Sequence, residues 1–153
     1  MLHIFFLVRS FNLKVDKEIK FSKVLNVSQK KAFEVVSNFE KYKEFIPGCN
    51  NSSLIERKHP VEVGCLEFNI LGKEYYIESK NILSEDSIEI NQIKGPFENF
   101  KGTWMVKKEN DDSCKIDFHA SFRLPFLLNA LTPQPLIDKF SNVVIDSFIK
   151  RVI

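Results

Sequence analysis

The sequence predicts an α+β domain in which a curved antiparallel β-sheet wraps around one long C-terminal helix. Apolar and polar residues alternate, as in strands, through the middle of the chain. The only long segment with helical periodicity lies at the C-terminus. Short turns join consecutive strand patterns, which makes neighbouring strands antiparallel. A chain of 153 residues is long enough to bury a real core as one domain.

Residues 1–17 are expected to form a leader or disordered extension before a single domain at residues 18–153. The apolar run at the N-terminus is shorter than the roughly 20 residues that span a membrane. Arg9 follows this run instead of preceding it, unlike the order in a secretory signal. Because no acid occurs before Asp16, the segment is compatible with a short mitochondrial presequence.

A first strand is predicted at residues 18–27, followed by two short helices. Ser28 is expected to cap the first helix. The inner face of that helix would carry Ala32, Phe33, Val36 and Phe39. Asn38 is a candidate cap for the second helix, which the Pro47-Gly48 pair ends.

Further strand patterns bring the predicted sheet to about six to seven strands. They lie near residues 52–58, 63–71, 75–80, 88–90, 100–107 and 114–122. The last of these alternates most regularly, with Ile116, Phe118 and Phe122 on one face. Asp117, His119 and Arg123 lie on the other face, so we interpret this charged group as solvated and not as an acid–base cluster.

The C-terminal helix is predicted over residues 133–151, with Thr132 as its N-cap. Its apolar stripe would be Leu136, Ile137, Phe140, Val143, Val144 and Phe148. We expect Phe140 to face Trp104 across the interface between helix and sheet. Ile145 and Ile149 lie off the stripe, at the helix edge or on an outer ridge. A sheet that grips one helix in this way, the helix-grip arrangement, tends to leave a cavity between them.

The composition has an excess of phenylalanine, with 15 Phe against 5 Gly and 2 Met. Two interpretations remain open, a cavity lined by aromatic rings or Phe in place of Leu in an ordinary core. The net charge of +2 gives no broad footprint for DNA or other nucleic acid. The cysteines and histidines show no metal-ligand spacing, and no nucleophile is paired with a base. We therefore expect neither an enzyme nor a metal site.

Three stretches resemble the coenzyme Q-binding family of START-like (polyketide cyclase-like) domains. They are Tyr42-Lys-Glu-Phe-Ile-Pro-Gly-Cys49, Gly95-Pro-Phe-Glu-Asn-Phe-Lys-Gly-Thr-Trp104, and Cys114-Lys-Ile-Asp-Phe-His-Ala-Ser-Phe122 followed by Phe148-Ile-Lys-Arg151. The resemblance extends from about Lys17 to the last residue. Lys43, Arg123 and Pro125 depart from the family's pattern.

This resemblance implies one of two functions. One is non-catalytic binding of a polyprenyl quinone, coenzyme Q (ubiquinone), by a carrier that supports respiration and quinone biosynthesis on the matrix side of the mitochondrial inner membrane. The other is that of a bacterial toxin in the cytoplasm, which binds the large ribosomal subunit and blocks subunit joining. The motifs do not separate the two, although residues 35–43 look closer to the mitochondrial form.

For quinone binding, the expected pocket consists of side chains on inward-facing positions. They are Phe33, Val36, Phe45, Phe68, Ile77, Trp104, Phe118, Phe122, Phe140, Val144 and Phe148. Ser79, Asn81 and Gln92 are the inward polar candidates for the quinone head. Phe45, Ile46 and Pro47 form an expected contact with a membrane or partner. The quinone is a bound ligand, and no resident cofactor is expected.

Overall fold

The computed structural model describes residues 16–70, 72–125 and 132–153. Most of the expected leader, residues 1–15, and Leu71 of a predicted turn lie outside the described residues. The domain boundary near residue 17 therefore stays a prediction. No helix in the described part of the chain is long and apolar enough to cross a membrane.

A seven-stranded antiparallel sheet, with the spatial order β1-β7-β6-β5-β4-β3-β2, forms the body of the protein. Its strands are β1 (Lys17–Leu25), β2 (Cys49–Lys58), β3 (Val61–Ile70), β4 (Lys73–Leu83), β5 (Ser87–Lys94), β6 (Glu98–Asn110) and β7 (Ser113–Arg123). The helices are α2 (Gln29–Ser37), the 3-10 helix η1 (Phe39–Lys41), α3 (Tyr42–Phe45) and α5 (Gln134–Val152). The predicted fold class is confirmed.

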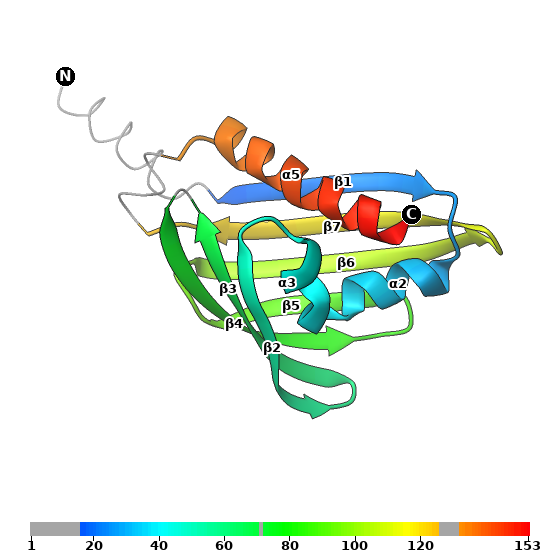
Figure 1. Cartoon of the computed structure of the whole chain (residues 1–153), viewed down its shortest axis with the longest axis horizontal. Helices are drawn as coiled ribbons and strands as arrows, with labels where there is room; N and C mark the ends of the chain where they lie inside the picture. The colour runs from blue at the N-terminus through cyan, green and yellow to red at the C-terminus, as the bar shows by residue number, and fades with distance from the viewer. Residues whose placement is uncertain (1–15, 71, 126–131) are drawn as a thin grey trace, which may run out of the picture.

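All of these helices lie on the inner face of the curved sheet (Figure 1). α5 runs along β1, and its C-terminal half meets α2 and α3. The Gln134 side chain fixes the start of α5 to β1. Its Nε2 donates to the Glu18 carbonyl at 2.7 Å, and its Oε1 accepts from the Glu18 amide at 3.2 Å.

The predicted capping of the helices is correct at one of three positions. Ser28 Oγ accepts a hydrogen bond from the Lys31 amide at 3.2 Å, as expected for an N-cap. Asn38 makes no side-chain cap, so that prediction was wrong. Thr132 was also wrong as a cap, because the helix begins at Gln134 and Pro133 occupies the N-cap position. Proline fits there because it has no amide hydrogen to satisfy.

The buried face of α5 differs from the predicted stripe. Its buried residues are Ser141, Ile145, Phe148 and Val152, whereas Leu136, Phe140 and Val143 are exposed. The prediction counted apolar residues only and therefore passed over Ser141. This serine can be buried because its hydroxyl donates to the Ile137 carbonyl at 2.7 Å. The buried face is therefore rotated relative to the predicted stripe, and Ile145 lies inside and not on an outer ridge.

Phe39 packs directly on the backbone of Gly64 in β3. A Cβ atom at Gly64 would lie 2.2 Å from the Phe39 ring, far inside van der Waals contact. Phe39 itself is buried. A glycine at this position therefore allows η1 to lie close against the sheet, which brings α3 over its inner face.

Candidate ligand-binding site

A cavity of about 210 Å³ lies between α5 and the inner face of the sheet. Its lining includes most of the side chains expected from the sequence, namely Phe68, Ile77, Trp104, Phe118, Phe122, Phe140, Val144 and Phe148. It also includes residues absent from the expected set, namely Ile19, Tyr42, Ile46, Leu66, Ile90, Phe97, Phe100 and Ile145, together with Ser79 and Ser141. The wall is almost wholly apolar.

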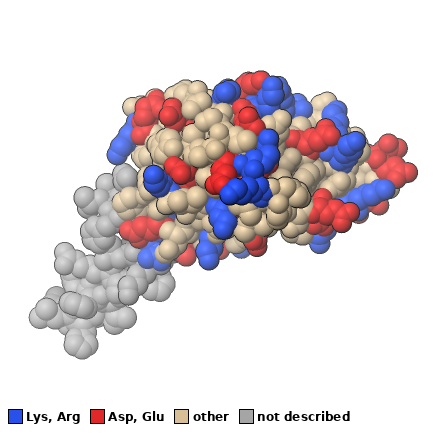
Figure 2. All heavy atoms as spheres, turned by 90° about the horizontal axis from the view of Figure 1, so that it is seen from below, with Lys and Arg blue, Asp and Glu red and all other residues tan. Residues whose placement is uncertain are grey.

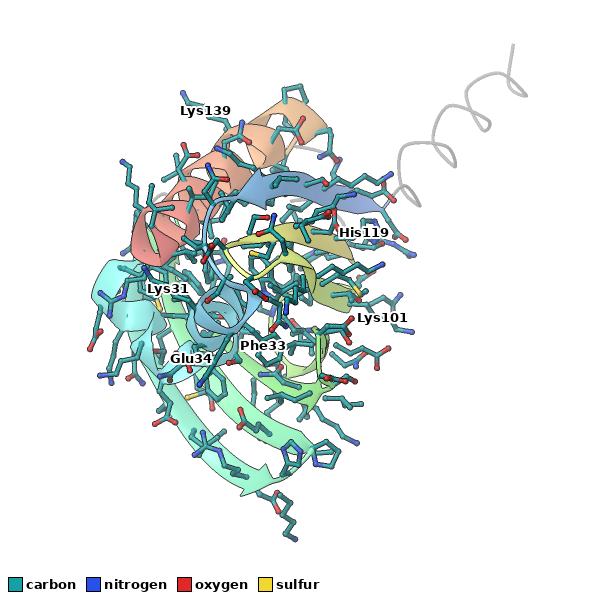
Figure 3. The ribbon with its side chains drawn as sticks, turned by 90° about the vertical axis from the view of Figure 1, so that its right-hand side faces the viewer. Lys31, Phe33, Glu34, Lys101, His119 and Lys139 are labelled. Carbon is teal, nitrogen blue, oxygen red and sulfur yellow. The ribbon has the colours of Figure 1, made fainter. Side chains whose placement is uncertain are left out.

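Three expected residues lie elsewhere. Val36 is buried in the core beneath α2, beside a smaller chamber of about 50 Å³. Phe33 is half-buried on α2, where Figure 3 labels it. The Phe45 ring packs edge-on against Phe148, at 5.3 Å between centroids, and faces a surface groove instead of the cavity. The sequence pattern identified the inward face of each short helix, but it did not show which part of the core that face covers.

Two aromatic groups form the walls of the cavity. In the first, Trp104 contacts Phe118 and Phe148, with ring centroids 4.5 and 5.0 Å apart. Phe148 therefore takes the place across from Trp104 that the sequence had suggested for Phe140. In the second group, Phe97 and Phe100 lie 5.1 and 5.8 Å from the Phe122 ring.

The turn between β5 and β6 positions Phe97. Gln92 Nε2 donates to the Phe97 carbonyl at 2.6 Å, and Gln92 Oε1 accepts from the Phe97 amide at 3.3 Å. Gly95 permits this arrangement, because a Cβ there would lie 2.3 Å from Gln92 Oε1. Gln92 was a candidate for the quinone head, but its amide is already engaged by the backbone.

The chain alternates irregularly at the start of β6, and this explains why Phe97 and Phe100 were missed. Asn99 adopts a positive φ of 56°. The pairing of β6 with β7 shifts register between Glu98 and Lys101, which is the mark of a β-bulge. The bulge lets two rings three residues apart face the same side, whereas strict alternation would separate them.

Two other polar side chains of the cavity also have partners. Tyr42 is buried, its hydroxyl donates to the Val36 carbonyl, and burial raises the pKa of that hydroxyl well above its usual range. Ser79 Oγ donates to Asn81 Oδ1 at 3.0 Å. Asn81 lies in the smaller chamber, which shares Tyr42, Ser79 and Trp104 with the main cavity.

The charged group on β7 points away from the cavity. His119 has a half-exposed side chain near Glu18, and Arg123 pairs with Asp16 at 3.1 Å. Figure 3 shows His119 and Lys101 projecting from the side of the sheet opposite α5. Among the described residues, no cluster of three His, Cys, Asp or Glu could hold a metal ion.

The expected membrane or partner contact is only partly exposed. Ile46 is 5% exposed and lines the cavity, so its assignment to an exposed tip was wrong. It turns inward because α3 ends at Phe45 and the chain becomes extended at Ile46. Pro47 is exposed, and Phe45 is half-buried under the Arg151 guanidinium, 5.2 Å from its ring centroid.

The family model described as "Polyketide cyclase / dehydrase and lipid transport" matches residues 25–149. The chain belongs to this family. The match covers strands β2 to β7, all of α2, η1 and α3, and most of α5, but only the last residue of β1. This confirms the resemblance to START-like, polyketide cyclase-like domains.

The relatives of this family member include proteins named as ribosome association toxins and one named as a coenzyme Q-binding protein. "Ribosome association toxin RatA" of Pseudomonas aeruginosa is 28% identical over 138 residues, which cover 90% of this chain and 96% of the relative. "Coenzyme Q-binding protein COQ10 homolog B, mitochondrial" of Xenopus laevis is 25% identical over 143 residues, which cover 89% of this chain and 59% of the relative. Both functions implied by the sequence motifs are therefore represented among the relatives.

Among solved structures, the Zhui aromatase/cyclase from Streptomyces superposes with a TM-score of 0.79. The two chains are 12% identical, and the match covers 90% of this chain and 94% of the other. At this identity the similarity shows a shared fold, with the same layering of sheet and helix.

Proposed function

We propose that this family member binds a polyprenyl quinone, or a closely similar isoprenoid lipid, in the cavity beneath α5 and carries it without chemical change. The observation that carries the proposal is the wall of the cavity, which consists almost entirely of aromatic and aliphatic side chains. An isoprenoid tail offers only apolar surface, and its burial contributes roughly 25 cal/mol per Å². The relative named as a coenzyme Q-binding protein supports the same ligand class.

The size of the cavity bears on how such a lipid would be held. At about 210 Å³, it is smaller than the roughly 300–1,000 Å³ of pockets that enclose drug-sized ligands. A long tail would therefore extend out of the cavity. Phe140, which lines the cavity and is 37% exposed, marks a place where the tail would leave.

A lipid that is partly outside its carrier needs a nearby bilayer. The surface groove lined by Phe45, Pro47 and Val143, with Asp146, Lys150 and Arg151 beside it, is our candidate for peripheral contact with a membrane. Arg151 is paired with Glu44, so Lys150 is the basic residue of this groove that would meet an anionic lipid surface. The word "mitochondrial" in the name of one relative supports our proposal that the protein acts in the mitochondrion. We propose the matrix side of the inner membrane as the place, and support of respiration and quinone biosynthesis as the role.

Ribosome association is the second candidate, and the names of the bacterial relatives favour it. Binding to the large subunit, in the bacterial cytoplasm, would use basic side chains on the outer face of the sheet, such as Lys101 and Lys107. Arg123 suits this role less, since Asp16 and Glu98 lie within 4 Å of it. Figure 2 shows acidic and basic side chains interspersed on the face in view, without a broad area of one sign.

One experiment separates the two candidates. The full chain is purified from a quinone-producing host, its bound lipids are extracted and identified by mass spectrometry, and the protein is sedimented with ribosomes at two salt concentrations. We expect stoichiometric quinone and no salt-sensitive co-sedimentation. Protein that holds no quinone and cannot be loaded with it, but that sediments with large subunits at low salt only, would establish the second candidate, because phosphate contacts weaken steeply with salt.

A further inference from the structure

We propose that the cavity holds its ligand in one orientation, with a carbonyl oxygen of the head group accepting a hydrogen bond from the Asn81 side-chain amide. This inference rests on the proposed function and specifies how the same site selects its ligand. The tail would then lie along the main cavity toward Phe140, and the head would point into the smaller chamber beneath α2.

The Asn81 side chain is 7% exposed, yet only half of its amide group has a partner. Its Oδ1 accepts from Ser79 Oγ at 3.0 Å. Among the described residues, the hydrogen bond found for this amide is the one at Oδ1. Because no fully enclosed side-chain polar atom there lacks a partner, the Nδ2 is open to the chamber that Asn81 lines. An unpaired donor in apolar surroundings is unfavourable, so a ligand that supplies an acceptor there is preferred over one that does not.

The position of Asn81 follows from strand register. In the sheet, Asn81 of β4 pairs with Glu62 of β3 and with Ile90 of β5, so all three point to the inner face. Continuing across β6 and β7, the same row contains Gly102 and Ala120. A Cβ at Gly102 would meet the Phe100 and Phe118 rings at 3.5 and 3.6 Å, so these small residues make room for rings of the cavity wall. Asn81 lies in the same row and lines the adjoining chamber.

Other polar groups around the two chambers do not compete for this role. Glu62 has no hydrogen to donate, and its Oε1 accepts from Arg57 Nε at 2.8 Å, which balances its charge. Tyr42 and Ser141 donate their hydroxyl hydrogens to backbone carbonyls. Within the described part of the cavity wall, Asn81 therefore supplies the donor that remains for a ligand.

The chamber also limits what can reach Asn81. Its volume of about 50 Å³ admits the edge of a ring and its carbonyl oxygen, but not the whole ring. The ring would lie at the junction of the two spaces, which Tyr42, Leu66 and Trp104 line in common. A flat ring beside these aromatic side chains, with one carbonyl at Asn81, fits a quinone better than a plain hydrocarbon.

The test compares two probes of equal tail length on the full chain. One is a benzoquinone with a tail of three isoprene units, and the other is the isoprenoid hydrocarbon farnesene, which has no oxygen. Trp104 is the one tryptophan in the sequence and lines the cavity, so its quenching reports quinone binding. Farnesene binding is then measured as displacement of the quinone.

Asn81→Leu keeps the volume of the side chain and removes the donor. We expect it to weaken quinone binding about five- to tenfold, the effect of one hydrogen bond, and to change farnesene binding less than about twofold. Asn91→Leu is the matched control, because it makes the same change on the outer face of the sheet, where Asn91 pairs with Lys80 and Lys101, and it should change quinone binding little. Equal effects of Asn81→Leu on both probes, or none on either, would overturn the inference.

A second measurement needs no variant. The infrared carbonyl band of the bound quinone should split in the wild-type protein, with one component shifted to lower frequency by the hydrogen bond. An unshifted pair of carbonyls would overturn the proposed orientation while leaving lipid binding intact. A wild-type protein that binds neither probe would instead remove the proposed function together with this inference.

Discussion

Arg151 Nη2 lies 2.7 Å from Glu44 Oε2, so that the last turn of α5 is bonded to α3. Glu44 also accepts from Lys41 Nζ at 3.2 Å. The Arg151 guanidinium additionally covers the face of Phe45. α3 and α5 thus form one side of the cavity as a connected unit, although 107 residues separate Glu44 from Arg151 along the chain.

We expect Arg151→Met to lower the unfolding midpoint at neutral pH and to lose this effect in acid. Hydrogen bonds from Lys41 and, secondarily, Arg151 lower the pKa of the Glu44 carboxyl. The stabilisation is therefore complete above the ordinary carboxyl range near pH 4 and is lost as the pH falls through the lowered value in the folded state. Thermal unfolding of wild type and variant from pH 7 to pH 3 shows whether the difference between their midpoints disappears in acid.

Lys108→Met provides the control for that experiment. Its exposed partner Asp111 lies 2.9 Å away, in the turn between β6 and β7, and the pair links no separate elements. We expect a smaller change in midpoint than for Arg151→Met. A constant difference between Arg151→Met and wild type down to pH 3 would show that the variant acts through the contact with Phe45 and not through Glu44.

Gly64→Ala should destabilise the protein by about 1–3 kcal/mol, the typical cost of overpacking a core. The new methyl group would overlap the Phe39 ring. Gly102→Ala is a matched control in the same sheet, since its Cβ would meet the nearest atoms at an ordinary 3.5 Å. Urea denaturation should show no loss for the control, and similar losses for both variants would contradict the packing of Phe39 on Gly64.

Phe140→Ala and Phe148→Ala should differ strongly in stability. Phe148 is buried among Tyr42, Phe45 and Trp104, and its truncation should cost about 3–5 kcal/mol. Phe140 is partly exposed, so truncation there should cost much less, under about 1 kcal/mol, because little buried volume is lost. Equilibrium denaturation measures the loss of unfolding free energy for both variants. Equal losses would show that Phe140 is packed in the core as Phe148 is.

Val144→Trp should reduce the amount of co-purified quinone while leaving the fold intact. Val144 lines the cavity, and a larger side chain there would occupy space that the ligand needs. Asn142→Trp, two residues earlier, places the same side chain on the exposed face of α5, outside both the cavity and the proposed membrane groove, and serves as control. Lipid extraction and mass spectrometry of both variants give the comparison, and equal quinone content would mean that the ligand lies elsewhere.

The sequence was sufficient to predict the strands and the terminal helix, because their periodicities are long and regular. It predicted much of the cavity wall for the same reason, since alternation in β7 and β6 identifies Phe118, Phe122 and Trp104 as inward. It could not predict the rotation of α5, because the buried face includes the polar Ser141, which a count of apolar residues passes over. Nor could it predict Phe97 and Phe100 on one wall, because a bulge at Asn99 interrupts the alternation.

The pairing of β1 with β7 affects the order in which native contacts form during synthesis. β1 is paired along its whole length with the last strand, from Lys17 opposite Phe122 to Leu25 opposite Cys114. During synthesis, therefore, the first strand has no native neighbour until β7 has left the ribosome, and contacts so distant in sequence form slowly. The cavity walls run from Ile19 to Phe148, so the cavity is complete only when both the first strand and the last helix are in place. Binding of the lipid that we propose would therefore follow completion of the domain and could not begin on the nascent chain.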